Sequence, residues 1–447
     1  MLSNNKYLFY LIGALCSFNL SLFAAESLNN SEDSLTFSSL RSETSTINQE
    51  DYYDFIRVSI IEQPEYSYAL SSMEEKNMLV KYQQRHRFPD LSFRVINDRS
   101  ISRDVDDFTS IRKRRDDSFD AAVEINQPIY SGGSINNRIK IARIDYSLSR
   151  SERNRIFSEL IVDANKIYLD AVKSDFIYSY SSKVLNELFP FLEKVKERVN
   201  LGISDPIELA IFSIKYNSLS SKVQKLRTQK NRDIGVFEYF YKRKFENNFF
   251  PEILVPKLQS NNKESYEVEK ARLSYENKEG QVALTKSEFR PQFGINVRYT
   301  RYDIDDNETE DNDLRGGLTF SMPIFTFGRA SAKISSAKAH ANASKMSIGM
   351  EKKADEVREN EIVNVIESSQ KTRNELDSSY QDTKRQRNII VDRLDVTSFS
   401  ADSLVNSYTE EIALLENILD TEMALLHGYF LYLHQNKTLI NQLGIMP

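Results

Sequence analysis

The residue types that most often perform chemistry in proteins are sparse in this chain of 447 residues. Its histidines are His86, His340, His427 and His434, and none has the spacing to other ligands that a metal site requires. His427 and His434 are expected to pack against other helices or to face water. No glycine-rich phosphate loop and no set of serine, histidine and aspartate can be assembled. The sequence therefore predicts no enzymatic activity, no bound metal and no cofactor.

The only cysteine, Cys16, lies in an N-terminal segment that is typical of a secretory signal peptide. Lys6 precedes a mostly apolar stretch, and this stretch ends in small residues at Ala24-Ala25. Residues 1–25 are therefore expected to be removed on export, which leaves a mature chain without thiol or disulfide chemistry. A lipid-modified Cys16 is the weaker alternative, because Leu15 stands where lipidation needs a small residue.

Composition limits the classes of partner. The chain carries a formal net charge of -6, and this mildly acidic balance gives no electrostatic footprint for nucleic acid. The basic run at residues 112–115 is flanked by aspartates and is expected to be a solvated loop. Residues 26–48 are rich in Ser, Asn, Glu and Thr and are expected to form a flexible leader. After the signal, no segment has the ~18 uninterrupted apolar residues of a membrane-spanning helix.

The sequence elements that must position any functional residue occur twice. Residues 128–133 (PIYSGG) return 195 positions later as residues 323–328 (PIFTFG), and Pro89 returns 202 positions later as Pro291. Proline ends strand pairing, and glycine permits a sharp change of direction. A transition from strand to helix is therefore expected at each copy, at Pro128, Gly132, Gly133, Pro323 and Gly328.

Segments with an alternating pattern precede each of these transitions. Apolar residues occupy every second position in four segments: Leu91, Phe93, Val95; Phe119, Ala121, Val123, Ile125; Phe293, Ile295, Val297, Tyr299; and Leu314, Gly316, Leu318, Phe320. This period of two predicts four strands with one apolar and one polar face. Polar loops are expected at about 98–117 and 301–313.

Long helical segments follow the strands. Residues 134–189 contain neither Gly nor Pro, and an apolar stripe at every third or fourth position predicts helices of ~65–75 residues, about 100 Å long. A shorter helix is expected over about 50–86. The first long helix should reverse at residues 201–206, where Gly202 ends it and Asp205 caps a helix that returns to about 245.

The other boundaries follow from the same reasoning. The first repeat is assigned to 49–245, a linker to 246–262, and the second repeat to 263–443. The second reversal is expected near 406–411, and the last helix should end at about 443.

Strands with one apolar and one polar face suit a barrel wall with lipid outside and water inside. A soluble sandwich with its apolar faces packed together is the alternative. Four strands cannot close a barrel, and open edges in lipid would leave backbone groups unpaired. A membrane location would therefore require several chains to complete the barrel, and twelve strands would leave an open channel.

Together these features resemble the TolC-like outer-membrane channels, the exit ducts of efflux pumps and type I secretion systems. The resemblance covers roughly residues 50–443 and rests on residues 127–133 and 322–329, Gly202, Tyr408 and Ile418-Leu419-Asp420. It implies an α+β, mainly α fold with two internal repeats. A homotrimer would then form a transmembrane β-barrel, with four strands per chain, and a long periplasmic coiled-coil α-barrel.

The resemblance also implies a gate at the periplasmic tip, where the second helix pair reverses. Asp420 fits one acidic position of this gate, and the neighbouring position holds Asn417, with Glu416 beside it. Tyr408 precedes the second reversal, and Glu411 stands where the family has its tip glycine. A ring of three Asp420 side chains would attract cations. The alternative is that Asp420 only faces solvent.

The leading hypothesis is a passive outer-membrane exit duct with its helical part in the periplasm. Its partners would be outer-membrane lipid, a periplasmic adaptor protein and an inner-membrane ABC or proton-driven transporter, and it would bind no nucleic acid. Type I protein secretion and small-molecule efflux use the same architecture and stay equally open. The alternatives are a periplasmic coiled-coil adaptor and a structural coiled-coil protein of the cell envelope.

Overall fold

A computed structural model describes most of the chain that follows the predicted leader. The described residues are 45–99, 117–246, 249–253, 255, 258, 264–302, 304, 312–393 and 401–444. The predicted signal peptide, most of the leader, and most of the two predicted polar loops lie outside these residues.

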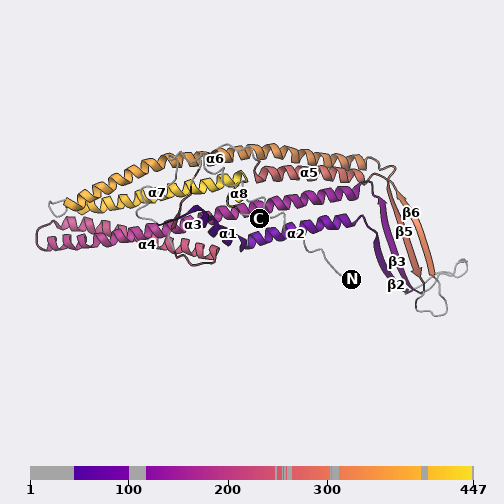
Figure 1. The fold of residues 1–447 in the computed structure, drawn as a ribbon, viewed down its shortest axis with the longest axis horizontal. Helices are drawn as coiled ribbons and strands as arrows, with labels where there is room; N and C mark the ends of the chain where they lie inside the picture. The colour runs from indigo at the N-terminus through magenta and orange to yellow at the C-terminus, as the bar shows by residue number, and fades with distance from the viewer. Residues whose placement is uncertain are drawn as a thin grey trace, which may run out of the picture.

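Both halves of the chain contain the same order of elements (Figure 1). The first half contains α2 (Pro64–Arg85), β2 (Asp90–Arg99), β3 (Asp117–Tyr130), α3 (Ser134–Asn200) and α4 (Pro206–Tyr241). The second contains α5 (Tyr266–Ser287), β5 (Gln292–Arg301), β6 (Asn312–Ser321), α6 (Arg329–Arg393) and α7 (Ala401–Gln435). The remaining elements are β1 (Ser45–Ile47), α1 (Gln49–Ile61), β4 (Phe249–Pro251) and α8 (Leu439–Gln442). The long helices run along the long axis of the molecule, and the four-stranded sheet projects from one end of them (Figure 1). This arrangement agrees with the predicted mainly α fold class.

Four of the strands form an antiparallel sheet in the order β2-β3-β5-β6. Within the first hairpin Asp90 lies opposite Asn126, and within the second Gln292 lies opposite Ser321. Shifting the first pair by the repeat spacings of 202 and 195 residues gives the second pair, so the two hairpins share one register. The first half joins the second where β3 pairs with β5.

The register places the alternating apolar residues on a single face of the sheet. Val123 lies between Phe93 and Tyr299, and Tyr299 lies opposite Leu314, so apolar side chains meet across all four strands. On the other face Glu124 bonds Arg298 at 3.3 Å. The apolar residues stay exposed, with Leu318 85% exposed, and no helix packs on the sheet in the described part of the chain (Figure 1). The predicted alternation is confirmed, and nothing in the described chain covers the apolar face.

The first long helix, α3, has 67 residues and is about 100 Å long at 1.5 Å per residue. It continues through Pro190, which lies near the end that is distant from the sheet. A proline removes one backbone hydrogen bond, and the many contacts of so long a helix with its neighbours compensate for this loss.

The helix predicted over 50–86 is broken into α1 and α2. Pro64 occupies the first turn of α2, where its missing N–H costs nothing, and Gln63 precedes it in extended conformation. The side chain of Gln63 is buried, and its Nε2 donates to the backbone oxygen of Phe240 at 2.8 Å. This contact fixes the break against α4.

The second helix reversal lies before the predicted position. Residues 406–411 are helical within α7, and the chain reverses between Arg393 and Ala401, at residues outside the described part. Leu404, Tyr408 and Ile412 are buried at helical spacing, so they continue the helix instead of ending it. The last helical segment reaches Gln442, close to the predicted end at about 443, but the helix is interrupted, because α7 ends at Gln435 and α8 follows after a short break.

Two short segments outside the repeats join through backbone pairing. β1, at the end of the predicted flexible leader, pairs in parallel with β4, which lies in the predicted linker. The Tyr168 hydroxyl donates to the backbone oxygen of Phe249 at 2.8 Å, and Phe250 and Ile253 are buried. These apolar residues explain why part of the linker is fixed against α3.

The main core lies midway along the helices and is rich in aromatic side chains. Tyr52 is fully buried, lies 4.9 Å from the ring of Tyr168, and donates to Asn165 Oδ1 at 2.8 Å. Burial of a large side chain stabilises the fold by roughly 1.5–3 kcal/mol. A second core, which includes Leu188, Phe212 and Leu404, lies toward the helix reversals.

Candidate functional site

The strand-to-helix junctions place the helices relative to the sheet. In the first junction Gly132 and Gly133 have φ of +64° and +91°, which L side chains rarely adopt. A Cβ atom on Gly132 would lie 2.6 Å from the backbone oxygen of Ser287, so the start of α3 packs tightly against the end of α5. Pro128 still pairs with Gly294 in the sheet, so strand pairing continues past the predicted stop.

The second junction has the same backbone and a different environment. Phe327 and Gly328 have φ of +48° and +84°, close to the values of Gly132 and Gly133. Pro323 is the second residue after the end of β6 at Ser321. A Cβ atom on Gly328 would meet nothing within 4 Å, and the Phe327 ring is 89% exposed. The described chain therefore leaves this junction open.

The first helix reversal contains Gly202 and Asp205. Gly202 has φ of +74°, and the turn closes where Ile203 N donates to Arg198 O at 2.8 Å. Asp205 Oδ1 accepts from Ile207 N at 2.8 Å and caps α4. Figure 1 shows this reversal at the end of the molecule opposite the sheet.

Two of the carboxylates predicted for the gate, Asp420 and Glu416, lie along α7 and pair with lysines. Asp420 forms an ion pair with Lys173 of α3, and Glu416 Oε2 lies 2.7 Å from Lys222 Nζ of α4. Asn417 is exposed and shares a helix face with Asp420, three residues later. The Asp420 side chain is 59% exposed, whereas the side chain of Lys173 is 19% exposed, so this face of α7 presents mainly the carboxylate to solvent.

Tyr408 and Glu411 lie between helices and not at a reversal. Glu411 is fully buried, accepts from the Tyr180 hydroxyl at 2.5 Å, and lies 3.1 Å from Arg387 Nη1. The Tyr408 hydroxyl donates to Glu187 Oε2 at 3.2 Å, and burial raises the pKa of Tyr408 to about 12. Glu411 therefore does not lie at a helix tip, as its assignment to the tip glycine position implied. It contacts α3 and α6 from within α7 and holds the three helices together.

Sequence reasoning missed a buried carboxylate on the same helix. Glu422 pairs with Arg373 of α6, and its side chain is 4% exposed. Burial raises the pKa of Glu422 to about 7, although Arg373 acts against this shift and Asp377 adds to it. Only the helix pairing identifies this group, because its partner lies 49 residues away in the sequence.

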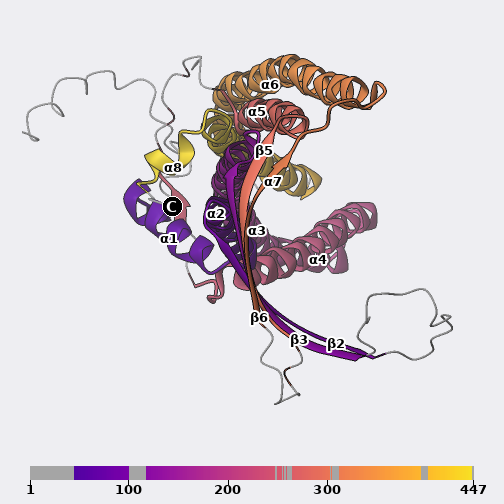
Figure 2. The same cartoon turned by 90° about the vertical axis from the view of Figure 1, so that its right-hand side faces the viewer.

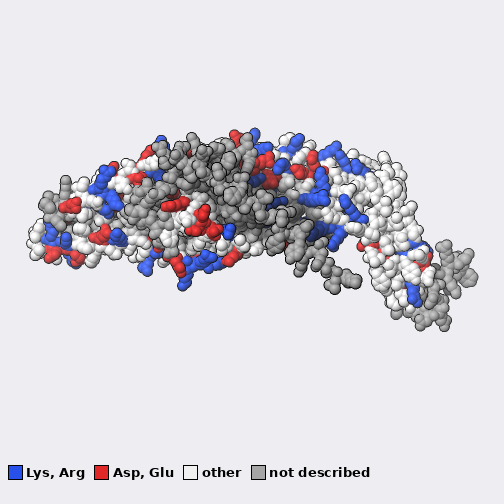
Figure 3. All heavy atoms as spheres, in the orientation of Figure 1, with Lys and Arg blue, Asp and Glu red and all other residues white. Residues whose placement is uncertain are grey.

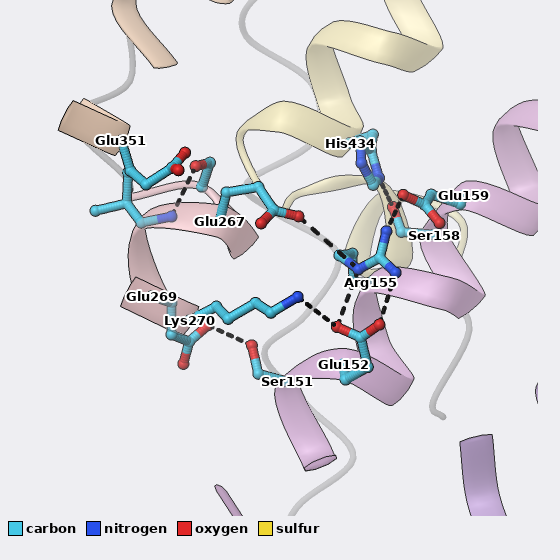
Figure 4. Close-up of polar contacts among 12 residues, drawn as sticks. Ser151, Glu152, Arg155, Ser158, Glu159, Glu267, Glu269, Lys270, Glu351 and His434 are labelled. Atoms are coloured by element: carbon cyan, nitrogen blue, oxygen red, sulfur yellow. Dashed lines mark hydrogen bonds and ion pairs between the residues drawn. The ribbon is translucent and has the colours of Figure 1, made fainter. Parts of the chain in front are cut away.

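A second polar cluster, also missed, joins α3, α5 and the end of α7 (Figure 4). Arg155 lies at its centre, 2.6 Å from Glu152 and 4.0 Å from Glu267. Nearby, His434 Nδ1 lies 2.8 Å from Ser158 Oγ, and burial lowers the pKa of His434 to about 4. The cluster is an ion network between helices with a neutral histidine at its edge.

Neither a metal cluster nor a membrane helix emerges from the described residues. No group of three or more His, Cys, Asp or Glu side chains there could hold a metal ion. Within the same ranges, no helix carries a stretch both long and apolar enough to cross a membrane. Figure 3 shows charged side chains of both signs spread over the helical body, whereas the visible side of the sheet is mostly uncharged.

Comparison with solved structures decides the fold. The CmeC outer membrane channel of Campylobacter jejuni is 11% identical, the match covers 86% of this chain and 85% of CmeC, and the TM-score is 0.74. The MtrE outer membrane channel of Neisseria gonorrhoeae, in its open state, is 12% identical over 91% of this chain and 95% of MtrE, with a TM-score of 0.73. The outer membrane protein VceC of Vibrio cholerae is 13% identical over 85% of this chain and 96% of VceC, with a TM-score of 0.69.

This chain has the TolC-like outer-membrane channel fold. No family model and no curated protein sequence matches it. In the TolC-like fold a few strands per chain accompany a helical barrel, which agrees with the predicted architecture. The structural neighbours are channel proteins and not enzymes.

Proposed function

We propose that this protein is an outer-membrane exit duct, in which several copies complete a transmembrane barrel and a helical channel. The observation that carries the proposal is the uncovered apolar face of the four-stranded sheet, at the end of helices about 100 Å long. A face of this kind is stable in lipid and unstable in water. In water it would be an exposed apolar patch that promotes association.

A homotrimer would pair the open edges of the four-stranded sheet and would enclose a water-filled lumen. Each chain supplies four strands with two open edges, and open edges cannot stand in a membrane. Three copies would give about twelve strands, a barrel too wide for side chains to fill. The polar face, with Glu124, Arg298 and Asn296, would line the water-filled interior.

The helical part would extend into the periplasm. Each of the two helix pairs, α3 with α4 and α6 with α7, has its connected ends away from the sheet (Figure 1). These helix ends would face an inner-membrane transporter, joined through a periplasmic adaptor protein. A gate that involves Asp420 and Asn417, on one exposed face of α7, would lie about 30 Å along the helix from its start at Ala401 and not at the reversal itself. Each Asp420 carries a lysine partner, so the pore would be less acidic than a bare carboxylate ring.

Membrane extraction and co-purification test this proposal. The protein should sediment with the outer membrane, need detergent for extraction and run as a trimer. After crosslinking in native cells, an ABC-type transporter with its adaptor would assign the duct to type I secretion of a polypeptide. A proton-driven pump would assign it to small-molecule efflux. A protein that stays soluble without detergent would contradict the duct and favour an adaptor or a structural coiled coil.

A further inference from the structure

The edge strand β6 is shorter than β3, its counterpart inside the sheet. β3 runs on to Tyr130, and its last residues pair with β5, with Pro128 opposite Gly294 and Tyr130 opposite Phe293. β6 occupies the corresponding place in the second repeat but ends at Ser321. Residues 322–325, which correspond to 127–130, pair with no strand in the described chain, and Ile324 is 94% exposed. The difference follows from what lies beside each strand: β5 lies beside β3, and β6 has an open edge.

The two repeats have such similar backbone geometry that the pairing seen in one can be used to predict the pairing of the other. Arg87 N donates to Gln84 O at 3.3 Å after α2, and Phe289 N donates to Lys286 O at 3.3 Å after α5. Before α3 and α6, the first backbone bonds are 2.9 and 3.0 Å at equivalent positions. The spacings of 202 and 195 residues therefore match equivalent backbone positions, residue by residue.

We propose that β6 of one copy pairs with β2 of a second copy in the register that β3 and β5 use within the chain. The proposal rests on the proposed function, in which several copies close the barrel. Asn126 lies opposite Asn296, and the repeat spacings convert this pair into Ser321 and Arg94. The partner's Arg94 therefore lies opposite Ser321.

The same rule sets the neighbouring pairs: Thr319 opposite the partner's Ile96, Phe320 opposite the partner's Val95, and Met322 opposite the partner's Phe93. All four of the exposed apolar side chains in the last two pairs then fall on the apolar face of the sheet. A slip by one residue would set an apolar residue against the polar face at every position. The pairing also gives residues 322–325 the backbone partners that 127–130 have.

The proposed contact between β6 and the partner's β2 (the seam between copies) must differ at one point from the contact between β3 and β5 (the seam within the chain). Phe327 occupies the position of Gly132, whose Cβ atom would lie 2.6 Å from the backbone oxygen of Ser287. The equivalent neighbour between copies is the partner's Arg85, and a phenylalanine cannot approach it as closely as glycine does. The seam between copies is therefore wider on the helix side, and the Phe325 and Phe327 rings, with centroids 4.5 Å apart, fill the added space.

Paired cysteines test the register directly. With Cys16 replaced by Ser, the chain contains no other cysteine. In R94C/S321C the two cysteines lie on the outermost strands, three strand spacings apart. The register within the chain sets Arg94 level with Asp313 on β6, eight residues before Ser321, so the two cysteines cannot join within one chain. Between copies they should lie directly opposite, and mild oxidation of membranes should give covalent dimers and trimers that reduction dissolves.

Two slipped pairs and one internal pair are the matched controls. I96C/S321C and S92C/S321C lie on the same face but are displaced by two residues, so they should crosslink about fivefold less than R94C/S321C. N126C/N296C is the equivalent pair within the chain and should oxidise without linking copies.

The outcomes separate this proposal from the proposed function. Equal or stronger crosslinking of a slipped pair would overturn the register. The same holds if an amine-reactive crosslinker captures trimers, N126C/N296C oxidises, and R94C/S321C gives no linked copies. If neither chemistry captures any oligomer from the membrane, closure of the barrel by several copies is itself contradicted.

Discussion

The buried carboxylate of Glu422 gives a prediction with a defined sign and size. Its pKa is raised from 4.5 to about 7, so between these values the folded protein binds a proton that the unfolded chain does not bind. Stability contributed by this group is therefore fully present below about pH 4.5 and is lost as the pH rises through about 7. A difference of 2.5 units corresponds to about 3 kcal/mol per chain.

Glu422→Gln replaces the carboxyl with a neutral group of the same shape. Near pH 4.5 the variant and the parent should melt together, and at pH 8 the variant should be more stable by up to about 3 kcal/mol. Thermal unfolding followed by the helical circular dichroism signal, in detergent at several pH values, measures this change. Glu410→Gln removes an exposed carboxylate from the same helix and serves as the matched control.

The reasoning would be refuted if Glu422→Gln lost stability at pH 8. That result would mean that the charged pair with Arg373 stabilises the contact between α6 and α7 by more than burial costs.

Three further predictions concern the junctions, the buried network and the pore. Gly132→Ala should destabilise the protein by about 2 kcal/mol more than Gly328→Ala, because of the two only Gly132 has a backbone oxygen within 3 Å of the added carbon. Urea unfolding of both variants measures the difference, and equal losses of stability would contradict the packing at Gly132. Glu411→Ala should cost about 3–5 kcal/mol, because it removes the ion-pair partner of Arg387, whose side chain is 14% exposed. A melting curve that matches the parent would contradict this. If Asp420 lines the pore, Asp420→Ala should lower the cation preference of single channels and Lys173→Ala should raise it; unchanged reversal potentials in both would place the pair outside the conduction path.

The strands and junctions could be predicted because their signals are local. Alternation of apolar residues fixes the face of each strand, and the repeated proline and glycine residues mark where each strand leads into a helix. The register between β3 and β5 could not be read in the same way, because it joins residues about 170 positions apart.

The second helix reversal shows where local signals fail. Residues 406–411 contain polar side chains, yet Tyr408 and Glu411 are buried because α3 and α6 supply their hydrogen-bond partners. A polar residue that is satisfied between helices cannot be distinguished from one at a turn without its partners. The Arg155 cluster was missed for the same reason, since α3 meets α5 only in the folded chain.

Ion conduction in a planar lipid bilayer tests the central claim most directly. Detergent-purified trimers added to a bilayer should give discrete, long-lived conductance steps of uniform size, as expected for a water-filled duct closed by three chains. Absence of steps from trimers that have inserted into the bilayer would contradict the channel.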